Sequence, residues 1–243
     1  MANIIKLCAP NLEDFICSFY LTQDYSLEIY SPPSAISFRM IFSKKEEDEN
    51  AKTYSKLPSK DMDVYAKRLV KYLGAVYPVK HLRSSPGFLE VLSRAPDLLD
   101  FLPPRFCNLQ SLVLETWPTG GCLRAIRYLL SISPNITRLF LEMKESNLSD
   151  VGDYSEAGLS FPEMLSHLEY FEFIDAEGSD AEFRILNFLL RNEKVLKKIG
   201  VTFRSSVAQR DRKRHVARFS DKIRAGRKAS SSFQFAYNLK FTW

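Results

Sequence analysis

Glycine, histidine and cysteine are scarce in this chain of 243 residues, which contains nine, three and four of them. Rossmann and P-loop nucleotide sites need glycine-rich turns, and neither pattern is present. The cysteines form no CxxC pair, and a disulfide scaffold requires denser cysteine usage. We therefore expect reduced thiols in the core at Cys8, Cys17, Cys107 and Cys122.

Long apolar runs are also absent, and no stretch approaches the roughly 18 residues that a membrane-spanning helix needs. The opening segment, residues 1–6, lacks the basic and apolar regions of a secretory signal. Hydrophobic residues make up 45% and charged residues 26% of the chain, as in ordinary globular proteins. The sequence therefore predicts a soluble protein of the cytoplasm, the nucleus or both, without membrane attachment.

Catalytic patterns are missing as well. The three histidines, His81, His167 and His215, are far apart in the sequence, and no HExxH, GxSxG or P-loop pattern occurs. Acidic residues are numerous, but their positions are typical of helix caps and solvated surface. We expect no enzymatic activity, no cofactor and no metal site.

Charge is distributed unevenly behind a net charge of +5. Residues 204–228 contain ten basic and two acidic residues, and the rest of the chain is slightly acidic. We interpret this segment as a solvated tail, either a partly formed helix or disordered. The alternatives are a nuclear import signal and a contact with nucleic-acid phosphates. Both would use Arg210, Arg212, Lys213 and Arg214.

A leucine pattern, LxxLxL, recurs along the chain. Its second copy follows the first by 27 residues at all three positions, and the fourth follows the third by 28. Units of one strand and one helix stack into a curved solenoid, because a single unit cannot bury its own apolar surface. We therefore predict an α/β leucine-rich-repeat solenoid, with a curved, mainly parallel sheet and helices on the convex side. The copies are Leu109, Leu112 and Leu114; Ile136, Leu139 and Leu141; Leu168, Phe171 and Phe173; and Leu196, Ile199 and Val201, with weaker ones at Leu12, Phe15 and Cys17 and at Val79 and Leu82.

Helical periodicity separates the copies. Apolar residues three and four apart predict one helix over 123–130 and another over 183–190. The second helix has a capping box from Ser179 to Glu182, in which each side chain bonds to the other residue's backbone N–H. Strands and helices should therefore alternate along the chain.

The pattern also suggests a division of the chain. We assign leucine-rich repeats to 1–160, a strand-helix-strand block to 161–205 and a basic tail to 206–243. Polar insertions at 44–60 and 144–160 interrupt the repeats and are expected to be loops. The tail closes with a period-two alternation that predicts a terminal edge strand.

Two groups of motifs carry a family resemblance. The segment Tyr65–Leu69, the run Pro86–Leu92 and the block Cys107–Glu115 resemble plant F-box/leucine-rich-repeat proteins. The block His167–Phe173, with the later leucines and the ending Val195–Lys198, is similar to the FBD domain that closes many of those proteins. The resemblance implies the substrate-recognition half of a Skp–cullin–F-box (SCF) E3 ubiquitin ligase, in which the repeats bind the target protein.

The F-box itself, which should precede the repeats and bind the Skp adaptor, has no counterpart in this sequence. Leu57-Pro58 is isolated, and the two tryptophans are Trp117 and Trp243. The chain opens directly on apolar residues from Ile4, without the polar cap that terminal repeats carry. We therefore expect a truncated relative of a longer protein. Such a chain would not bind the adaptor, and adaptor and cullin would join only a form that supplies an F-box.

The residues between the leucines are candidates for binding a protein target. Successive side chains of a strand point to opposite faces, so these residues lie on the concave surface if the leucines lie in the core. Aromatic and arginine side chains often carry interface energy, although they can also simply cover the neighbouring strand. The sequence thus predicts a non-enzymatic protein-interaction module, with a nucleic-acid-binding module using 204–228 as the alternative. The candidates are Ser111, Val113, Glu115, Arg138, Phe140, Glu142, Tyr170, Glu172, Lys198 and Thr202.

Overall fold

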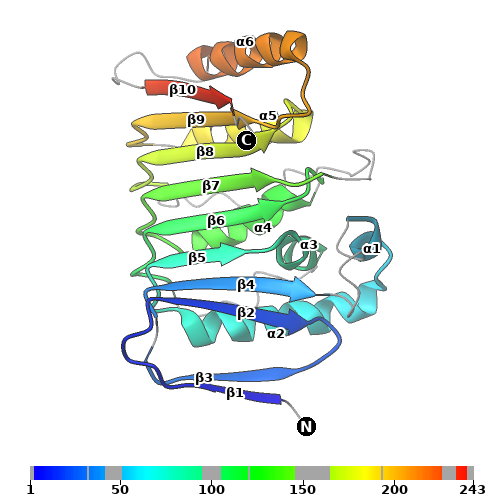
Figure 1. Cartoon of the computed structure of the whole chain (residues 1–243), viewed down its shortest axis with the longest axis vertical. Helices are drawn as coiled ribbons and strands as arrows, with labels where there is room; N and C mark the ends of the chain where they lie inside the picture. Colours follow the sequence, from blue (N-terminus) through cyan, green and yellow to red (C-terminus); the bar gives the residue numbers. More distant parts are fainter. Residues whose placement is uncertain are drawn as a thin grey trace.

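The computed structural model describes residues 3–31, 33–41, 51–94, 105–119, 121–145, 165–192, 194–225 and 234–239. Strands and helices alternate along most of this chain (Figure 1). In chain order the elements are β1 (Asn3–Leu7), β2 (Asp14–Tyr20), β3 (Tyr25–Ile29), β4 (Ala35–Ile41), α1 (Ala51–Ser55), α2 (Ser59–Val76), β5 (His81–Ser84), α3 (Pro86–Arg94), β6 (Ser111–Thr116), α4 (Cys122–Ser131), β7 (Arg138–Met143), β8 (Tyr170–Ala176), α5 (Asp180–Asn192), β9 (Lys198–Phe203), α6 (Gln209–Ala225) and β10 (Gln234–Leu239).

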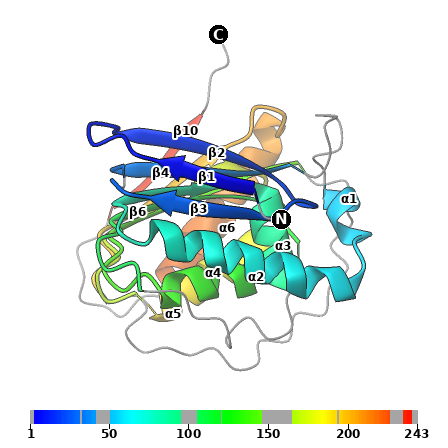
Figure 2. The ribbon, with the colours of Figure 1, turned by 90° about the horizontal axis from the view of Figure 1, so that it is seen from below.

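Eight of the strands form one parallel sheet in the order β10-β9-β8-β7-β6-β5-β4-β2. From β5 onward, each strand lies beside the strand that precedes it in the chain (Figure 1). β1 and β3 form a separate two-stranded parallel sheet. Helices α2, α3, α4 and α5 lie on the same side of the large sheet (Figure 2). The protein is therefore a mixed α/β protein built on a large parallel sheet.

The leucine pattern sets the register of the central strands. Leu112 of β6 pairs with Leu139 of β7, Leu139 with Phe171 of β8, and Phe171 with Ile199 of β9. Since parallel strands align equivalent positions, these side chains stack into one apolar layer. All twelve residues of the four strong copies are buried, with exposed fractions of 4% or less. The prediction that they belong to the core is confirmed.

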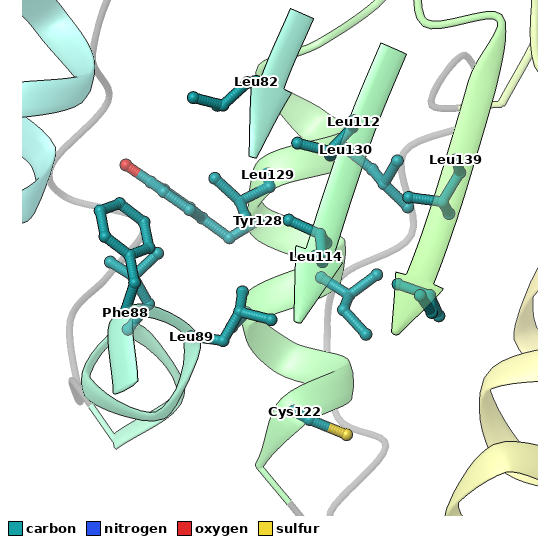
Figure 3. Packing of buried hydrophobic residues seen from close by; sticks show 14 of the residues in the cluster. Leu82, Phe88, Leu89, Leu112, Leu114, Cys122, Tyr128, Leu129, Leu130 and Leu139 are labelled. Carbon is teal, nitrogen blue, oxygen red and sulfur yellow. The ribbon is translucent and has the colours of Figure 1, made fainter. Parts of the chain in front are cut away.

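The core continues from this layer to the helices. Figure 3 shows Leu82, Leu112 and Leu139 on their strands, close to Leu129 and Leu130 of α4. The apolar stripe predicted over 123–130 thus faces the sheet. This orientation stabilises the fold, because burial of apolar surface contributes about 25 cal/mol of free energy per Å².

Aromatic side chains form the core at the β2 end of the sheet. The rings of Phe19 and Tyr72 stack with centroids 4.4 Å apart, and Phe19 lies 5.4 Å from Phe38. The Tyr72 hydroxyl accepts a hydrogen bond from the backbone N–H of Tyr25 at 3.1 Å. These contacts join α2 to β2, β3 and β4. Ile36 and Phe38 of β4 also occupy core positions of a leucine-pattern copy that our sequence analysis did not identify.

The basic segment contains a formed helix, α6. Phe219 and Ile223 are 0% and 3% exposed, and the ring of Phe219 lies 4.6 Å from that of Phe183. Of the two alternatives predicted for this segment, the helix is present over 209–225 and the disorder is not, because the few apolar residues share one side of the helix and reach the core. The predicted terminal strand is present as β10, which pairs in parallel with β9.

The polar insertions are described only in part. α1 and the start of α2 fall within the insertion predicted at 44–60, so that part is not a continuous loop. The charge run at 44–50 and residues 146–160 of the second insertion lie outside the described residues.

The cysteines are free thiols in two different environments. Cys17 and Cys122 are buried, whereas Cys8 and Cys107 are exposed, so the predicted core location is wrong for two of the four. Burial raises the pKa of Cys17 to about 11 and that of Cys122 to about 12, which keeps both protonated near neutral pH. None of the helices in the described ranges is long and apolar enough to cross a membrane.

Candidate interaction surface

All ten candidate residues lie on strands of the large sheet. We call the side of this sheet that faces away from α2, α3, α4 and α5 the open face (Figure 2). Along β6, β7 and β8 the candidate residues alternate with the buried residues of the leucine pattern. Arg138 is exposed, Ser111 and Thr202 are buried at 7% exposure, and the others are half-buried. The open face comprises Ser111, Val113, Glu115, Arg138, Phe140, Glu142, Tyr170, Glu172, Lys198 and Thr202, together with Arg83 of β5 and Gly200 of β9.

Four charged side chains form a closed ion-pair network on the open face and its edge. Nε of Arg83 lies 2.7 Å from Glu115, and its Nη2 lies 2.5 Å from Glu142. Nζ of Lys144, just after β7, lies 2.5 Å from Glu142 and 3.3 Å from Glu115. The two carboxylates are register neighbours that would repel each other, and the two cations offset this. Burial alone would raise the pKa of Glu142, but its bonds to Lys144 and Arg83 outweigh burial and lower that pKa.

An aromatic pair with flanking cations occupies the next strands. The rings of Phe140 and Tyr170 lie 5.4 Å apart between centroids, and Nζ of Lys198 lies 5.5 Å from the centroid of the Tyr170 ring. In the register, Tyr170 has Arg138 as its neighbour on β7 and Lys198 as its neighbour on β9. A row of cation, aromatic ring and cation therefore crosses three strands.

Glu172 is held by hydroxyl groups. The Tyr170 hydroxyl donates to its Oε2 at 2.5 Å, and the Thr202 hydroxyl donates to its Oε1 at 3.0 Å. Burial, followed by this bond to a carboxylate, raises the pKa of Tyr170 to about 12, so its proton stays in place. Gly200 leaves room for the Glu172 side chain, because a Cβ at position 200 would lie 3.1 Å from it.

A pocket of about 530 Å³ opens beside the ion-pair network. Ile16 of β2, Phe38 of β4, Tyr54 of α1 and Trp117 after β6 supply apolar lining, and Arg83, Glu115, Lys144 and Glu145 supply charge. Ile16 is 71% exposed, which is unusual for a large aliphatic residue. Close packing of α3 requires a glycine at 87, since a Cβ there would meet the Tyr54 hydroxyl at 2.3 Å.

Sequence reasoning missed several members of this surface. Arg83 directly follows Leu82 of a weak copy, so the alternation rule applied to that copy would have nominated it. The pocket residues have no comparable local signal. Ile16 and Trp117 lie about 100 residues apart, and only the sheet order brings their segments together.

The four basic residues predicted in the tail have different environments. Nη2 of Arg212 donates to the backbone carbonyl of Ser205 at 2.5 Å, so this side chain closes the turn before α6. Arg214 forms an ion pair with Asp211 at 3.5 Å, and Lys213 is exposed. The Arg210 side chain lies outside the described residues.

The histidines are not brought together. His81 lies in β5, His167 precedes β8 and His215 lies in α6. Within the described ranges there is no group of three or more histidine, cysteine, aspartate or glutamate side chains placed to hold a metal ion.

The strand-helix-strand block has the predicted capping box. The backbone N–H of Glu182 donates to the Ser179 hydroxyl at 3.3 Å, and Glu182 accepts from the N–H of Ser179 at 3.1 Å. This block is the part of the chain that resembles a known family: residues 160–201 match the FBD family model, over β8, α5 and most of β9. Comparison with curated proteins and with solved structures gave no match.

Proposed function

We propose that this chain is a non-enzymatic protein-interaction module whose open face binds a target protein. The observation that carries the proposal is the composition of that face. It offers a half-buried aromatic pair and two flanking cations on neighbouring parallel strands, and beside them a pocket with an exposed isoleucine. Aromatic and arginine side chains in such positions are the common anchors of protein interfaces.

We further propose that the sheet is the concave surface of a leucine-rich-repeat solenoid. The 27- and 28-residue intervals and the sequential order from β4 to β10 support this, because each repeat of a solenoid contacts only its neighbours. Such surfaces are used for binding extended or globular partners.

The FBD match supports a role within the F-box class. We propose that the open face selects a substrate for an SCF-type ubiquitin ligase inside the cell. The 243 residues contain no F-box pattern. The Skp adaptor and cullin would therefore join through an F-box supplied elsewhere.

Affinity purification with the whole chain tests the interaction proposal. Phe140→Ala/Tyr170→Ala should lose the partners that the unaltered chain retains, while Tyr77→Ala should keep them. Tyr77 is a suitable control because it is an aromatic residue 45% exposed at the end of α2. Partners that remain with all three proteins would contradict the proposal.

Nucleic-acid binding through α6 is a second candidate function. The helix turns its apolar side inward and leaves Lys213, Lys222 and Arg224 exposed. Phosphate contacts weaken steeply as salt rises, because binding releases counterions. Binding of random-sequence RNA that is strongly salt-dependent and lost in Lys213→Ala/Lys222→Ala/Arg224→Ala would favour this function over a protein target.

A further inference from the structure

The open face has a surplus of positive charge around the aromatic pair. Among the described residues, neither Arg138 nor Lys198 forms an ion pair, although both flank Tyr170. The nearby carboxylate of Glu172 already accepts from two hydroxyls, one on each oxygen. Glu169, beside the same strand end, is paired with Lys197 at 2.7 Å. Two cations are thus available to an external anion.

The rest of the open face has no such surplus. Glu115 and Glu142 are matched by Arg83 and Lys144 in the ion-pair network. Next to this network, the pocket offers the exposed side chain of Ile16, with the largely buried Phe38 and Trp117 behind it. The face is therefore divided into a cationic, aromatic half around Arg138, Tyr170 and Lys198 and an apolar, charge-balanced half that runs from Ile16 of β2 to Glu142 at the end of β7.

We propose that the partner of the open face is an extended, acidic protein segment. Its acidic residues pair with Arg138 and Lys198, and an apolar side chain of the same segment enters the pocket beside Ile16. This deepens the proposed protein-interaction function and rests on it. Charge complementarity of this kind selects partners and accelerates their encounter.

The distance between the two halves sets the length of the segment. Strands in a sheet are about 4.8 Å apart, so the six steps from β2, which carries Ile16, to β9 span about 29 Å. An extended chain advances about 3.4 Å per residue, so about eight or nine residues connect the halves. Aromatic rings with flanking cations also suit single-stranded nucleic acid. A continuous phosphate backbone, however, would pass over Glu115, Glu142 and Glu172, whereas a peptide can carry its charges at one end only.

Selection from random nine-residue peptides displayed on phage tests the proposal with the whole chain as bait. Enriched peptides should carry acidic residues on one side and a large apolar residue on the other. With Arg138→Ala/Lys198→Ala the acidic preference should vanish while the apolar one persists. With Ile16→Asp the apolar preference should vanish while the acidic one persists. Arg138→Glu/Lys198→Glu should shift the charge preference to basic residues.

Binding of an enriched peptide then gives the quantitative result. Arg138→Ala/Lys198→Ala should weaken it roughly tenfold, and Lys197→Ala, which removes a neighbouring but paired lysine, should leave it unchanged. The proposal is overturned if no acidic preference emerges, if Lys197→Ala weakens binding equally, or if oligo(dT) displaces the peptide and binds more tightly. If it fails while cellular partners still depend on Phe140 and Tyr170, the open face remains an interface and only the acidic segment is wrong.

Discussion

Glu182 closes the loop before α5 with a single buried carboxylate. It accepts the backbone N–H groups of Glu177, Gly178 and Ser179 at 3.0, 2.7 and 3.1 Å and is 1% exposed. The loop needs a glycine at 178, where φ is +81° and a Cβ would meet the ring of His215 at 2.1 Å. Side-chain caps of this kind satisfy N–H groups that the helix itself cannot.

The protonation of Glu182 should be visible in the pH dependence of stability. Burial raises its pKa to about 7, against the opposing effect of the three N–H bonds. Between about pH 5 and 7 the folded chain then holds a proton that the unfolded chain has lost, so this group makes stability fall as pH rises, by at most about 1.4 kcal/mol per pH unit.

Urea denaturation at pH 5, 6 and 7 measures this effect. Burial also lowers the pKa of His215, which gives the opposite slope near its own titration, so the informative quantity is the difference between the unaltered chain and Glu182→Gln. The free energy of unfolding of the unaltered chain, relative to that of Glu182→Gln, should be higher at pH 5 than at pH 7. An identical pH profile for both proteins would mean that Glu182 is ionised throughout this range.

The strands depend on the buried members of the leucine pattern. Leu112→Ala and Leu139→Ala remove side chains that are 0% exposed and pair across β6 and β7. Each should lower the free energy of unfolding by about 2–5 kcal/mol, because the surroundings only partly fill the cavity. Val113→Ala, on the half-buried open face, is the matched control with a smaller expected loss. Chemical denaturation of the three variants checks this, and equal losses would mean that the two faces are wrongly assigned.

Helix α6 depends on one aromatic anchor. Phe219 contacts the rings of Phe173, Phe183 and Phe203, with centroids 4.6 to 6.0 Å apart. Phe219→Ala should therefore cost about 3–5 kcal/mol if α6 unfolds together with the sheet. It should also increase hydrogen exchange in 209–225, whereas Lys213→Ala should change neither quantity. Unchanged exchange in Phe219→Ala would show that the helix forms without its core contact.

The whole molecule has a central and a peripheral part. β6, β7 and β8 each have neighbours on both sides, whereas β2 and β10 lie at the ends of the described sheet. In a protein built from neighbour contacts, opening requires less free energy at the ends than in the middle. Hydrogen exchange followed by mass spectrometry should therefore be slowest in β6 to β8 and faster in β2 and β10. Uniform protection along the sheet would instead indicate one cooperative unit.

Much of the central sheet was predictable because its signal is local. The spacing of Leu112, Leu139 and Phe171 gave both the strands and their buried faces, and the alternation rule placed Phe140 and Tyr170 on the opposite face. The capping box at Ser179 was readable for the same reason, since all its atoms lie within one turn. For α6 the sequence left helix and disorder as alternatives, because its three large apolar residues stabilise a helix only when a core is present to receive them.

The sequence by itself determined which residues of β6 to β9 face the core, because side chains alternate along a strand and apolar ones leave water. It also determined the helix-forming stripes between those strands. Tertiary structure alone decided which side chains share the open face across strands. The Arg83 network, the pocket at Ile16 and, among the described residues, the lack of an ion pair at Arg138 and Lys198 all depend on the order and register of the sheet. The physical reason is distance along the chain: these contacts join residues 27 to about 100 positions apart, and no periodicity of one segment encodes the partner it will meet.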